Sequence, residues 1–562
     1  MKHAKELNLT DLEPKDAQPE EARTEGFDDA SVGSSAALIS VCTIISRITG
    51  FLRTWSMAYA LGATFLSSSY QIANNLPSML YELVMGGMLT TAFLPVYLSV
   101  KKRLGKEQSS QYASNLLTLV VLALGVLSAL CMVFPSQVIY TQSFYSDQSV
   151  MGTATLFFQF FAIQIVFYGA SSIISGLLNA NRDYIWGAIA PVFNNVIVIA
   201  AFIAYAVIAP SNPDAAIYII AVGSPLGVFV QMVLQIPGLK RCGIRLRPRL
   251  DLKDPALRET ASIGLPALFV TVCGFVTVSV GNAASYSFAD NGPSVLAYSR
   301  LWYTFPYSML AIPVSTAMFT ELSSMQAEYD TKGVVRGIVS GTNQIFFLMI
   351  PFAVYLMVYA QPLVTLYHIG AFDEDGIAQI ASYLAVMAVS LPFYGVNSYL
   401  LMVFSSIRKM IAISVITLVG SVAQVVVIMG SVWLKGLGYP ATMEWIAVGS
   451  IAAYVIGDVL ALAFLGWRYS RCDFDGKSIF LSCFRGLLLG VAGGAVGGAL
   501  FWALETYVAP VGGSLPIALA YIVVCGCVSM FVTFAPAIRL KLPEAAFITA
   551  LWGKLMRKLR HR

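Results

Sequence analysis

Long apolar segments recur along almost the whole chain, and they constrain its fold more than any other feature. A membrane-spanning helix needs about 20 mainly apolar residues, and windows of that size give about fourteen candidates. They lie near 34–60, 68–99, 111–134, 152–178, 184–208, 215–237, 260–287, 295–322, 337–359, 377–405, 410–434, 442–467, 480–503 and 513–537. The charged fraction is only 12%, about half that of a soluble domain. The chain is therefore predicted to be an all-α polytopic membrane protein with about 14 transmembrane helices, of which 68–99 and 295–322 are amphipathic.

Lys and Arg are concentrated in the connections that a cytoplasmic N-terminus would place inside the cell. Clusters occur at 101–103, at 240–258 and at 408–409, whereas the outward connections hold only Lys435. Cytoplasmic loops of membrane proteins carry this excess of positive charge. The pattern predicts that both termini are cytoplasmic and that the inner face attracts anionic membrane lipid. The net charge of +5 belongs to that face, and no nucleic-acid partner is expected.

The longest basic connection divides twelve of the spans into two sets of six. Both sets begin in the same direction, so we expect parallel repeats related by a pseudo-twofold axis along the membrane normal. Leu76-Pro77 in span two and Phe305-Pro306 in span eight are a weak echo of this repeat. The predicted parts are a disordered acidic cytoplasmic tail (1–33), an N-terminal six-helix bundle (34–237), a basic cytoplasmic linker (238–258), a C-terminal six-helix bundle (259–467), two additional transmembrane helices (468–540) and a basic amphipathic cytoplasmic tail (541–562).

Two arginines interrupt the first apolar segment. Arg47, which follows Ser46, and Arg53 lie on one predicted helix, and an arginine at the bilayer centre costs roughly 2.5–3.5 kcal/mol. They would lie about 120° apart and about 9 Å apart in height, so both could line a wide cavity. Arg300 lies near the start of the equivalent span of the second repeat. Guanidinium groups bind phosphate oxygens through two parallel hydrogen bonds, so the trio predicts a cationic cavity suited to diphosphate. Alternatively, Arg47 pairs with a carboxylate and Arg53 reaches the outer interface.

The second span is unusually polar. Asn75, Ser78 and Glu82 share one helical face at three- and four-residue spacing, with Tyr81 beside them. We expect this face to line the same cavity, although a helix-packing face is the alternative. Candidate bend points in this span are Pro77, Gly86 and Gly87. Asp458 in span twelve is either functional or satisfied by a local hydrogen bond.

The pattern Ser46-Arg47-x-x-Gly50-Phe51-x-Arg53, followed by Gly62-Ala63, resembles the first-span signature of the MurJ (MviN) lipid II flippases. This family belongs to the multidrug/oligosaccharidyl-lipid/polysaccharide exporter superfamily. Further similarities cover about residues 36–430: Leu76-Pro77-x-x-Leu80 through Ala92-Phe93-Leu94-Pro95, Gly176-Leu177-Leu178-Asn179 with Ala190-Pro191 and Asn194, and Leu366-Tyr367-His368-Ile369-Gly370-Ala371-Phe372.

The resemblance implies a V-shaped pair of bundles in the bacterial cytoplasmic membrane. Such a protein moves undecaprenyl-diphosphate-linked disaccharide-pentapeptide from the inner to the outer leaflet by alternating access, for cell-wall synthesis. Arg47 and Arg53 match the family's arginines. In span two, however, Tyr81 stands where many members have arginine, and Ser68 and Gly86 stand at usual acidic positions. Span two is therefore divergent. Because 262–287 and 410–434 lack carboxylates, the sodium site proposed for some members is not expected.

Other functions remain open from the sequence. The same arginines would serve a flippase for another polyprenyl-diphosphate-linked glycan, and a cation-coupled multidrug exporter shares the architecture. A membrane-embedded transferase would need clustered catalytic acids, usually with a divalent metal, and only Asp373-Glu374-Asp375 comes close. An inactive scaffold for cell-wall assembly is a further alternative. We expect a transporter rather than an enzyme, with no cofactor and no metal site, and with the cell-wall synthesis machinery as a possible partner.

Overall fold

The computed structural model describes residues 29–86, 93–181, 183–244, 246–472, 474–545 and 549. Its regular elements are helical over this range, where no strand occurs, which confirms the all-α prediction. The predicted tails at 1–33 and 541–562 lie largely outside the described residues.

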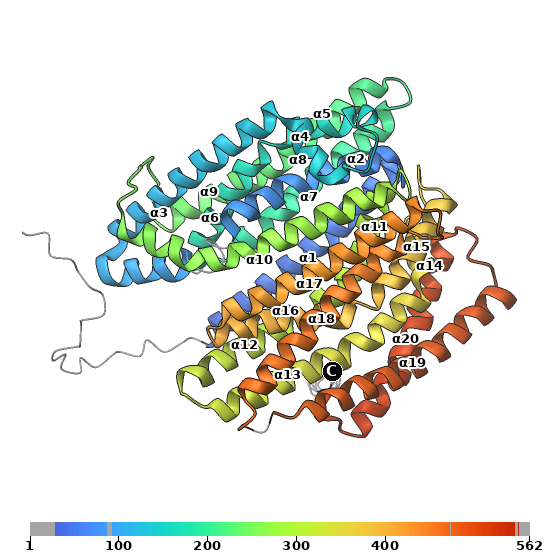
Figure 1. Ribbon diagram of the computed structural model, residues 1–562. Coiled ribbons are helices and arrows are strands. Elements are labelled where there is room, and N and C mark those ends of the chain that lie inside the picture. The colour runs from blue at the N-terminus through green and yellow to red at the C-terminus, as the bar shows by residue number, and fades with distance from the viewer. Residues whose placement is uncertain are drawn as a thin grey trace, which may run out of the picture.

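One group of helices comes from the N-terminal part of the chain and is called the N-lobe here (Figure 1). Within it α7 packs against α1 and α8, α3 packs against α6, and α2 packs against α5 and α6. The backbone of α3 breaks at Gly105, where spans two and three meet. The elements of the N-lobe are α1 (Asp29–Leu61), α2 (Phe65–Tyr81), the π-helix η1 (Glu82–Gly86), α3 (Leu94–Val133), α4 (Pro135–Ser143), α5 (Gly152–Phe161), α6 (Gln164–Ala180), α7 (Ile185–Ile208) and α8 (Pro213–Val233).

A second group forms the C-lobe. In it α13 packs against α12 and α16, while α18 packs against α15, α16 and α17. The last two helices, α19 (Gly476–Tyr507) and α20 (Leu515–Arg539), lie outside this group on α13 (Figure 1). The elements of the C-lobe are α11 (Gly292–Pro306), the π-helix η4 (Tyr307–Ala311), α12 (Ile312–Ala327), α13 (Thr331–Val358), α14 (Ala360–Thr365), α15 (Glu374–Ala388), α16 (Leu391–Ser406), α17 (Met410–Gly436) and α18 (Glu444–Arg468).

The connection between the lobes is ordered on the N-lobe. After the short helix α9 (Ile236–Arg241), the chain runs along α3. There Asn115 accepts a hydrogen bond from the Asp251 amide at 2.7 Å and donates one to the Asp251 carbonyl at 2.8 Å. The next helix, α10 (Pro255–Tyr286), packs on α17 of the C-lobe and also on α4 and η1 of the N-lobe. It therefore contacts both lobes.

Ten helices in the described residues are long and apolar enough to cross a membrane, or eleven if the pair α15 and α16, bent by 52°, forms one span. The predicted count of fourteen is thus not confirmed. The three predicted spans outside this set are 34–60, 68–99 and 295–322. In the last two, a proline is followed by a π-helix: Pro77 by η1 and Pro306 by η4. The similar motifs Leu76-Pro77 and Phe305-Pro306 therefore precede a π-helix in both repeats. A π-helix often marks a functional site.

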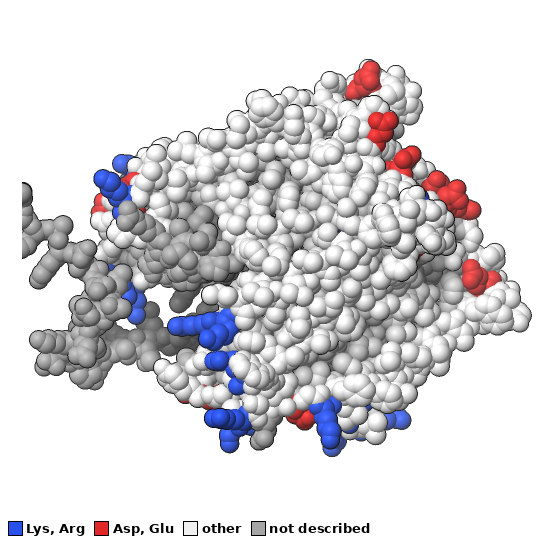
Figure 2. Space-filling view, in the orientation of Figure 1, with Lys and Arg blue, Asp and Glu red and all other residues white. Residues whose placement is uncertain are grey.

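Charged side chains separate along the molecule. Figure 2 shows Lys and Arg at the left and along the bottom of one face, and most of the visible Asp and Glu at the right. The C-terminal end of α1 lies at the right in Figure 1. We call the right end the outer end, following the orientation predicted from loop charge.

Candidate functional site

The lobes are joined at the outer end by a set of contacts that we call the clasp, between residues 55–68 and residues 291–298 and 366–371. Ala371 donates its amide hydrogen to the Tyr59 carbonyl, and Trp55 donates its indole hydrogen to the Leu366 carbonyl, each at 3.0 Å. Gly62 and Gly370 have φ of 63° and 64°, a left-handed conformation that glycine adopts without steric cost.

These two glycines also allow the backbones to approach each other. A Cβ on Gly62 would lie 2.2 Å from the Ala371 carbonyl oxygen, and a Cβ on Gly370 would lie 2.3 Å from the Tyr59 carbonyl oxygen. The contact is reciprocal, so any larger residue at either position would force the two segments apart.

The start of α11 completes the clasp. Tyr298 donates its hydroxyl hydrogen to the Gly62 carbonyl at 3.0 Å, and Asn291 donates a side-chain amide hydrogen to the Ala63 carbonyl at 3.0 Å. The Ser294 amide donates to the hydroxyl of Ser68 at 3.2 Å. The family-like motifs Gly62-Ala63 and 366–372, far apart in sequence, thus meet in one contact.

Between the lobes lies a cavity of about 150 Å³. Of the predicted site residues, Asn75 on α2 and Arg300 on α11 line it. Four tyrosines of the C-lobe surround it together with amide and hydroxyl side chains: Tyr303, Tyr383, Tyr394 and Tyr454, with Gln71, Asn282, Thr277, Gln424 and Ser450. The cavity has a mixed polar and apolar lining and carries one guanidinium group.

The second span meets Arg300 through its π-helix. The Glu82 carboxylate, at the first position of η1, and the Arg300 guanidinium interact electrostatically without forming an ion pair within 4.0 Å. Both side chains are exposed. Acidic and basic groups from the two repeats therefore face the same region at the junction of the lobes.

Arg53 approaches span two from α1. It lies close enough to Tyr168 on α6 for the two side chains to interact electrostatically. The Tyr168 ring in turn packs against Tyr81, with ring centroids 6.3 Å apart. Arg53, Tyr81, Glu82 and Arg300 thus lie in one continuous region. Tyr168 also belongs to it, although no sequence pattern singles this residue out.

Ser46 and Arg47 lie two turns nearer the N-terminus of α1. Arg47 is exposed and Ser46 is half-buried. This part of α1 is held to α7, where Asn195 donates to the Thr49 hydroxyl at 3.1 Å. The ion pairs among the described residues are Arg249–Asp251 and Arg485–Glu544. In that part of the chain, the alternative in which Arg47 pairs with a carboxylate does not occur.

The remaining predicted residues lie along span two. Ser78 is half-buried and donates its hydroxyl hydrogen to the Asn75 carbonyl at 2.9 Å. Pro77 is buried within α2, and Gly86 ends η1. Gly87 lies outside the described residues. The irregular helix is thus placed between Pro77 and the end of the described part of the span.

Asp458 on α18 is 2% exposed. Neither of its carboxyl oxygens makes a hydrogen bond of normal geometry to a described residue, although the Asn397 side chain is close by. Tyr454, one turn away on α18, lines the central cavity. Burying an unsatisfied carboxyl group is costly, so stability gives no reason for an acid at this position.

Two parts of the site were missed from the sequence. The clasp depends on pairing between segments about 300 residues apart, for which the only sequence signal is the repeated Gly-Ala of Gly62-Ala63 and Gly370-Ala371. The cavity tyrosines come from four helices, and nothing in a single apolar span separates a lining tyrosine from a packing one.

Known proteins are similar to this chain in sequence and in fold. The family model described as lipid II flippase MurJ matches residues 57–518. Lipid II flippase MurJ of Burkholderia cenocepacia is 26% identical over 360 residues, 63% of this chain and 69% of that protein. A probable lipid II flippase MurJ of Rhizobium meliloti is 25% identical over 517 residues, 89% and 92% of the two chains.

Two solved structures share the fold. The inward closed conformation of a lipid II flippase MurJ has a TM-score of 0.70 at 18% identity, over 90% of this chain and 99% of that one. An inward-facing multidrug resistance MATE family transporter of the MOP superfamily has a TM-score of 0.63 at 12% identity, over 79% and 99%. The resemblance seen in the sequence motifs is confirmed. Because the family model covers most of the chain, this multi-pass membrane protein belongs to the lipid II flippase MurJ family.

Proposed function

We propose that the protein moves lipid II, the undecaprenyl-diphosphate-linked disaccharide-pentapeptide precursor of peptidoglycan, from the inner to the outer leaflet by alternating access. The observation that carries this proposal is Arg300 in the cavity between the lobes, with Arg53 in the adjoining region around Tyr168 and Tyr81. Neither arginine has an ion-pair partner in the described part of the chain. A diphosphate supplies the negative charge that these guanidinium groups lack. Membership of the family supports lipid II as the substrate.

The geometry of the outer and inner ends of the molecule supports an inward-facing conformation. The clasp joins the lobes at the outer end, and Arg47 is exposed nearer the inner end of α1. With both termini in the cytoplasm, the substrate would reach the arginines from the inner leaflet and leave after the clasp opens. The basic inner face would attract anionic lipid, and the cell-wall synthesis machinery would receive the product.

The protein acts as a transporter in this scheme, and no bond of the substrate is broken. The rival substrates are other polyprenyl-diphosphate-linked glycans, which carry the same diphosphate. A cation-coupled multidrug exporter of the same fold should prefer acidic and aromatic cavity residues over arginines.

The test is depletion of the protein in its own host, followed by measurement of lipid II on each leaflet. We expect lipid II to accumulate on the inner leaflet, with rescue by the wild type but not by Arg47→Ala. Unchanged lipid II distribution, in a host with no second lipid II flippase, would refute lipid II as the substrate. The same assay on other polyprenyl-linked glycans would then identify the cargo.

A further inference from the structure

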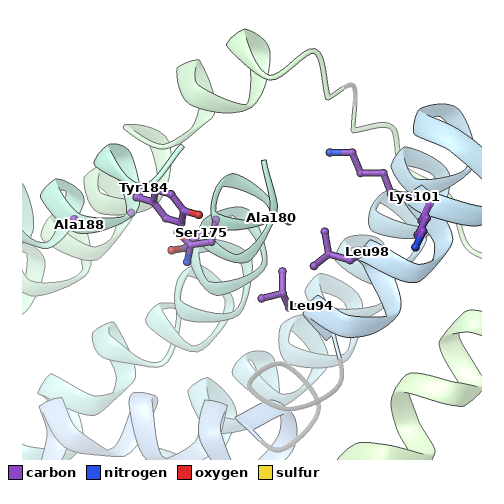
Figure 3. Close-up of a pocket in the computed structure, with 10 residues that line it drawn as sticks. Leu94, Leu98, Lys101, Ser175, Ala180, Tyr184 and Ala188 are labelled. Carbon is purple, nitrogen blue, oxygen red and sulfur yellow. The ribbon is translucent and has the colours of Figure 1, made fainter. Parts of the chain in front are cut away.

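A second, larger hollow lies within the N-lobe, and we call it the lysine groove. It has a volume of about 1010 Å³. In Figure 3, side chains of α3 stand on one side of the groove, and those of α6 and α7 stand on the other. Its lining residues are Leu94, Leu98, Lys101, Lys102, Ser175, Asn179, Ala180, Tyr184, Gly187 and Ala188. It belongs to neither the clasp nor the central cavity.

The rim of the groove carries two ammonium groups without carboxylate partners. Lys101 donates to the side-chain carbonyl of Asn181 at 2.6 Å, which holds its ammonium group at the groove. Lys102 is exposed. No carboxylate oxygen of a described residue lies within 4.0 Å of either ammonium group. The local positive charge is therefore available to an external anion.

The opposite wall supplies uncharged polar groups. Ser175 and Asn179 lie one turn apart on α6, and their side chains make no hydrogen bond to another described residue. Gly187 on α7 stands against Ser175, where a Cβ would lie 2.8 Å from the hydroxyl oxygen. Hydroxyl and amide groups beside lysines are donors that suit phosphate oxygens.

The groove is polarised along the membrane normal. Leu94, Leu98, Lys101 and Lys102 share one face of α3 at helical spacing, so Leu94 lies about 10 Å deeper than Lys101. In the orientation predicted from loop charge, the cations would lie at the headgroup level and the apolar side chains beneath them. This order matches an amphiphile with an anionic head and a hydrocarbon chain, and it does not match a soluble phosphate compound.

Size separates the groove from the central cavity. Pockets that enclose small molecules have volumes of about 300–1,000 Å³. The central cavity, at about 150 Å³, is too small for a glycan head in this conformation, whereas the groove has about 1010 Å³. A head group arriving from the inner leaflet finds room in the groove before it finds room at Arg300.

We propose that the lysine groove is an inner-leaflet loading site that binds the diphosphate head of the lipid-linked substrate before it moves to the central arginines. This inference rests on the proposed function and adds a site to it. Lys101 and Lys102 contact the phosphate oxygens, Ser175 and Asn179 donate to the head, and Leu94 and Leu98 cover the first isoprene units.

The test measures binding of undecaprenyl diphosphate to the full-length protein in phosphatidylcholine nanodiscs. The double variant Lys101→Gln/Lys102→Gln is compared with the wild type and with Lys332→Gln, an exposed lysine of α13 outside the groove. We expect at least about tenfold weaker binding by the double variant, because it loses two charge-assisted contacts, each worth about tenfold or more, and no change with Lys332→Gln. Equal binding by all three proteins would overturn the proposal.

A second titration with phosphatidylglycerol identifies the source of the phosphate. The proposal requires undecaprenyl diphosphate to bind more tightly than phosphatidylglycerol, with the lysine double variant affecting mainly the former. If both lipids bind equally and lose affinity equally, the groove is a general anionic-lipid site, and the proposal is overturned.

Two further outcomes separate this proposal from the proposed function. A double variant that binds and transports like the wild type, in a protein that flips lipid II, refutes only the loading site. An Arg300→Ala variant is expected to lose transport but to keep binding in the groove. If depletion of the protein leaves lipid II transport unchanged, the proposed function itself is refuted.

Discussion

At the residue scale, Arg300 is the clearest test of the central cavity. It is exposed there without an ion pair in the described residues, and it faces Glu82 electrostatically. Arg300→Ala should reduce lipid II transport in proteoliposomes by about tenfold or more, since one bidentate phosphate contact is lost. Arg300→Lys should retain only part of the activity, because an ammonium group cannot make the paired contact.

The stability of the same variants distinguishes a functional role from a structural one. Because Arg300 is exposed and forms no ion pair in the described residues, we expect the midpoint of thermal unfolding to stay close to that of the wild type, as for most exposed substitutions. A large fall in the midpoint for Arg300→Ala would show that the guanidinium group holds the lobes together, and it would remove this residue from the binding site.

Asp458 is a buried acid whose replacement should not lower the stability of the protein. Its carboxyl group is 2% exposed and lacks a hydrogen bond of normal geometry to a described residue. Asp458→Asn keeps the shape and removes the ionisable group, so we expect unchanged or higher thermal stability together with reduced transport, the trade-off typical of functional residues. Asp458→Ala removes the volume of the side chain as well as its charge, so it serves as a control for the loss of packing. Transport at the wild-type rate by Asp458→Asn would assign the residue no role in the cycle.

At the element scale, the end of α1 and the segment 366–371 form a contact that only glycine permits. In Gly370→Ala the new methyl group would meet the Tyr59 carbonyl oxygen at 2.3 Å, and φ of 64° would be strained. We expect the clasp to open in this variant and transport to fall. Gly436→Ala at the end of α17, where a Cβ has open space, is the matched control.

Accessibility of the outer end measures this effect directly. A cysteine introduced at Ala63 should react with a membrane-impermeant thiol reagent faster in the Gly370→Ala background than in the wild-type background, both in protein freed of its native cysteines. Equal rates would mean that the two segments do not need to touch, and the clasp would then not hold the lobes closed.

The sequence predicted elements better than contacts. Apolar length alone placed most helices, because a helix in lipid must satisfy its own backbone hydrogen bonds. Pro77 and Pro306 lie shortly before the π-helices η1 and η4. The sequence does not show which turn becomes a π-helix, because that depends on the packing of α10 against η1 and of α16 against η4. The pairing of Tyr59 with Ala371 depends on how two repeats fold toward each other, and no local pattern encodes that.

At the scale of the whole molecule, opening the outer end is the step with a definable cost. The clasp contains six hydrogen bonds between the lobes, each worth about 0.5–1.5 kcal/mol net. Breaking them costs about 3–9 kcal/mol. A potential of 100 mV supplies about 2.3 kcal/mol per charge moved, so charge movement of about one to four units would suffice to open the clasp.

The last prediction follows from that cost. If transport requires the clasp to open in every cycle, a covalent link across it should stop transport reversibly. The Ser294 amide and the Ser68 hydroxyl are joined by a hydrogen bond of 3.2 Å between the lobes. Cysteines at both positions, in protein without the eight native cysteines, should therefore be bridged by a short crosslinker that carries two thiol-reactive groups and a cleavable spacer. We expect the crosslinked protein to bind substrate from the inner leaflet but not to release it outside, and cleavage of the spacer to restore transport.

Each single-cysteine protein treated in the same way should transport normally. Undiminished transport by the fully crosslinked protein would mean that the lobes do not separate at this end, and alternating access about the central arginines would have to be abandoned.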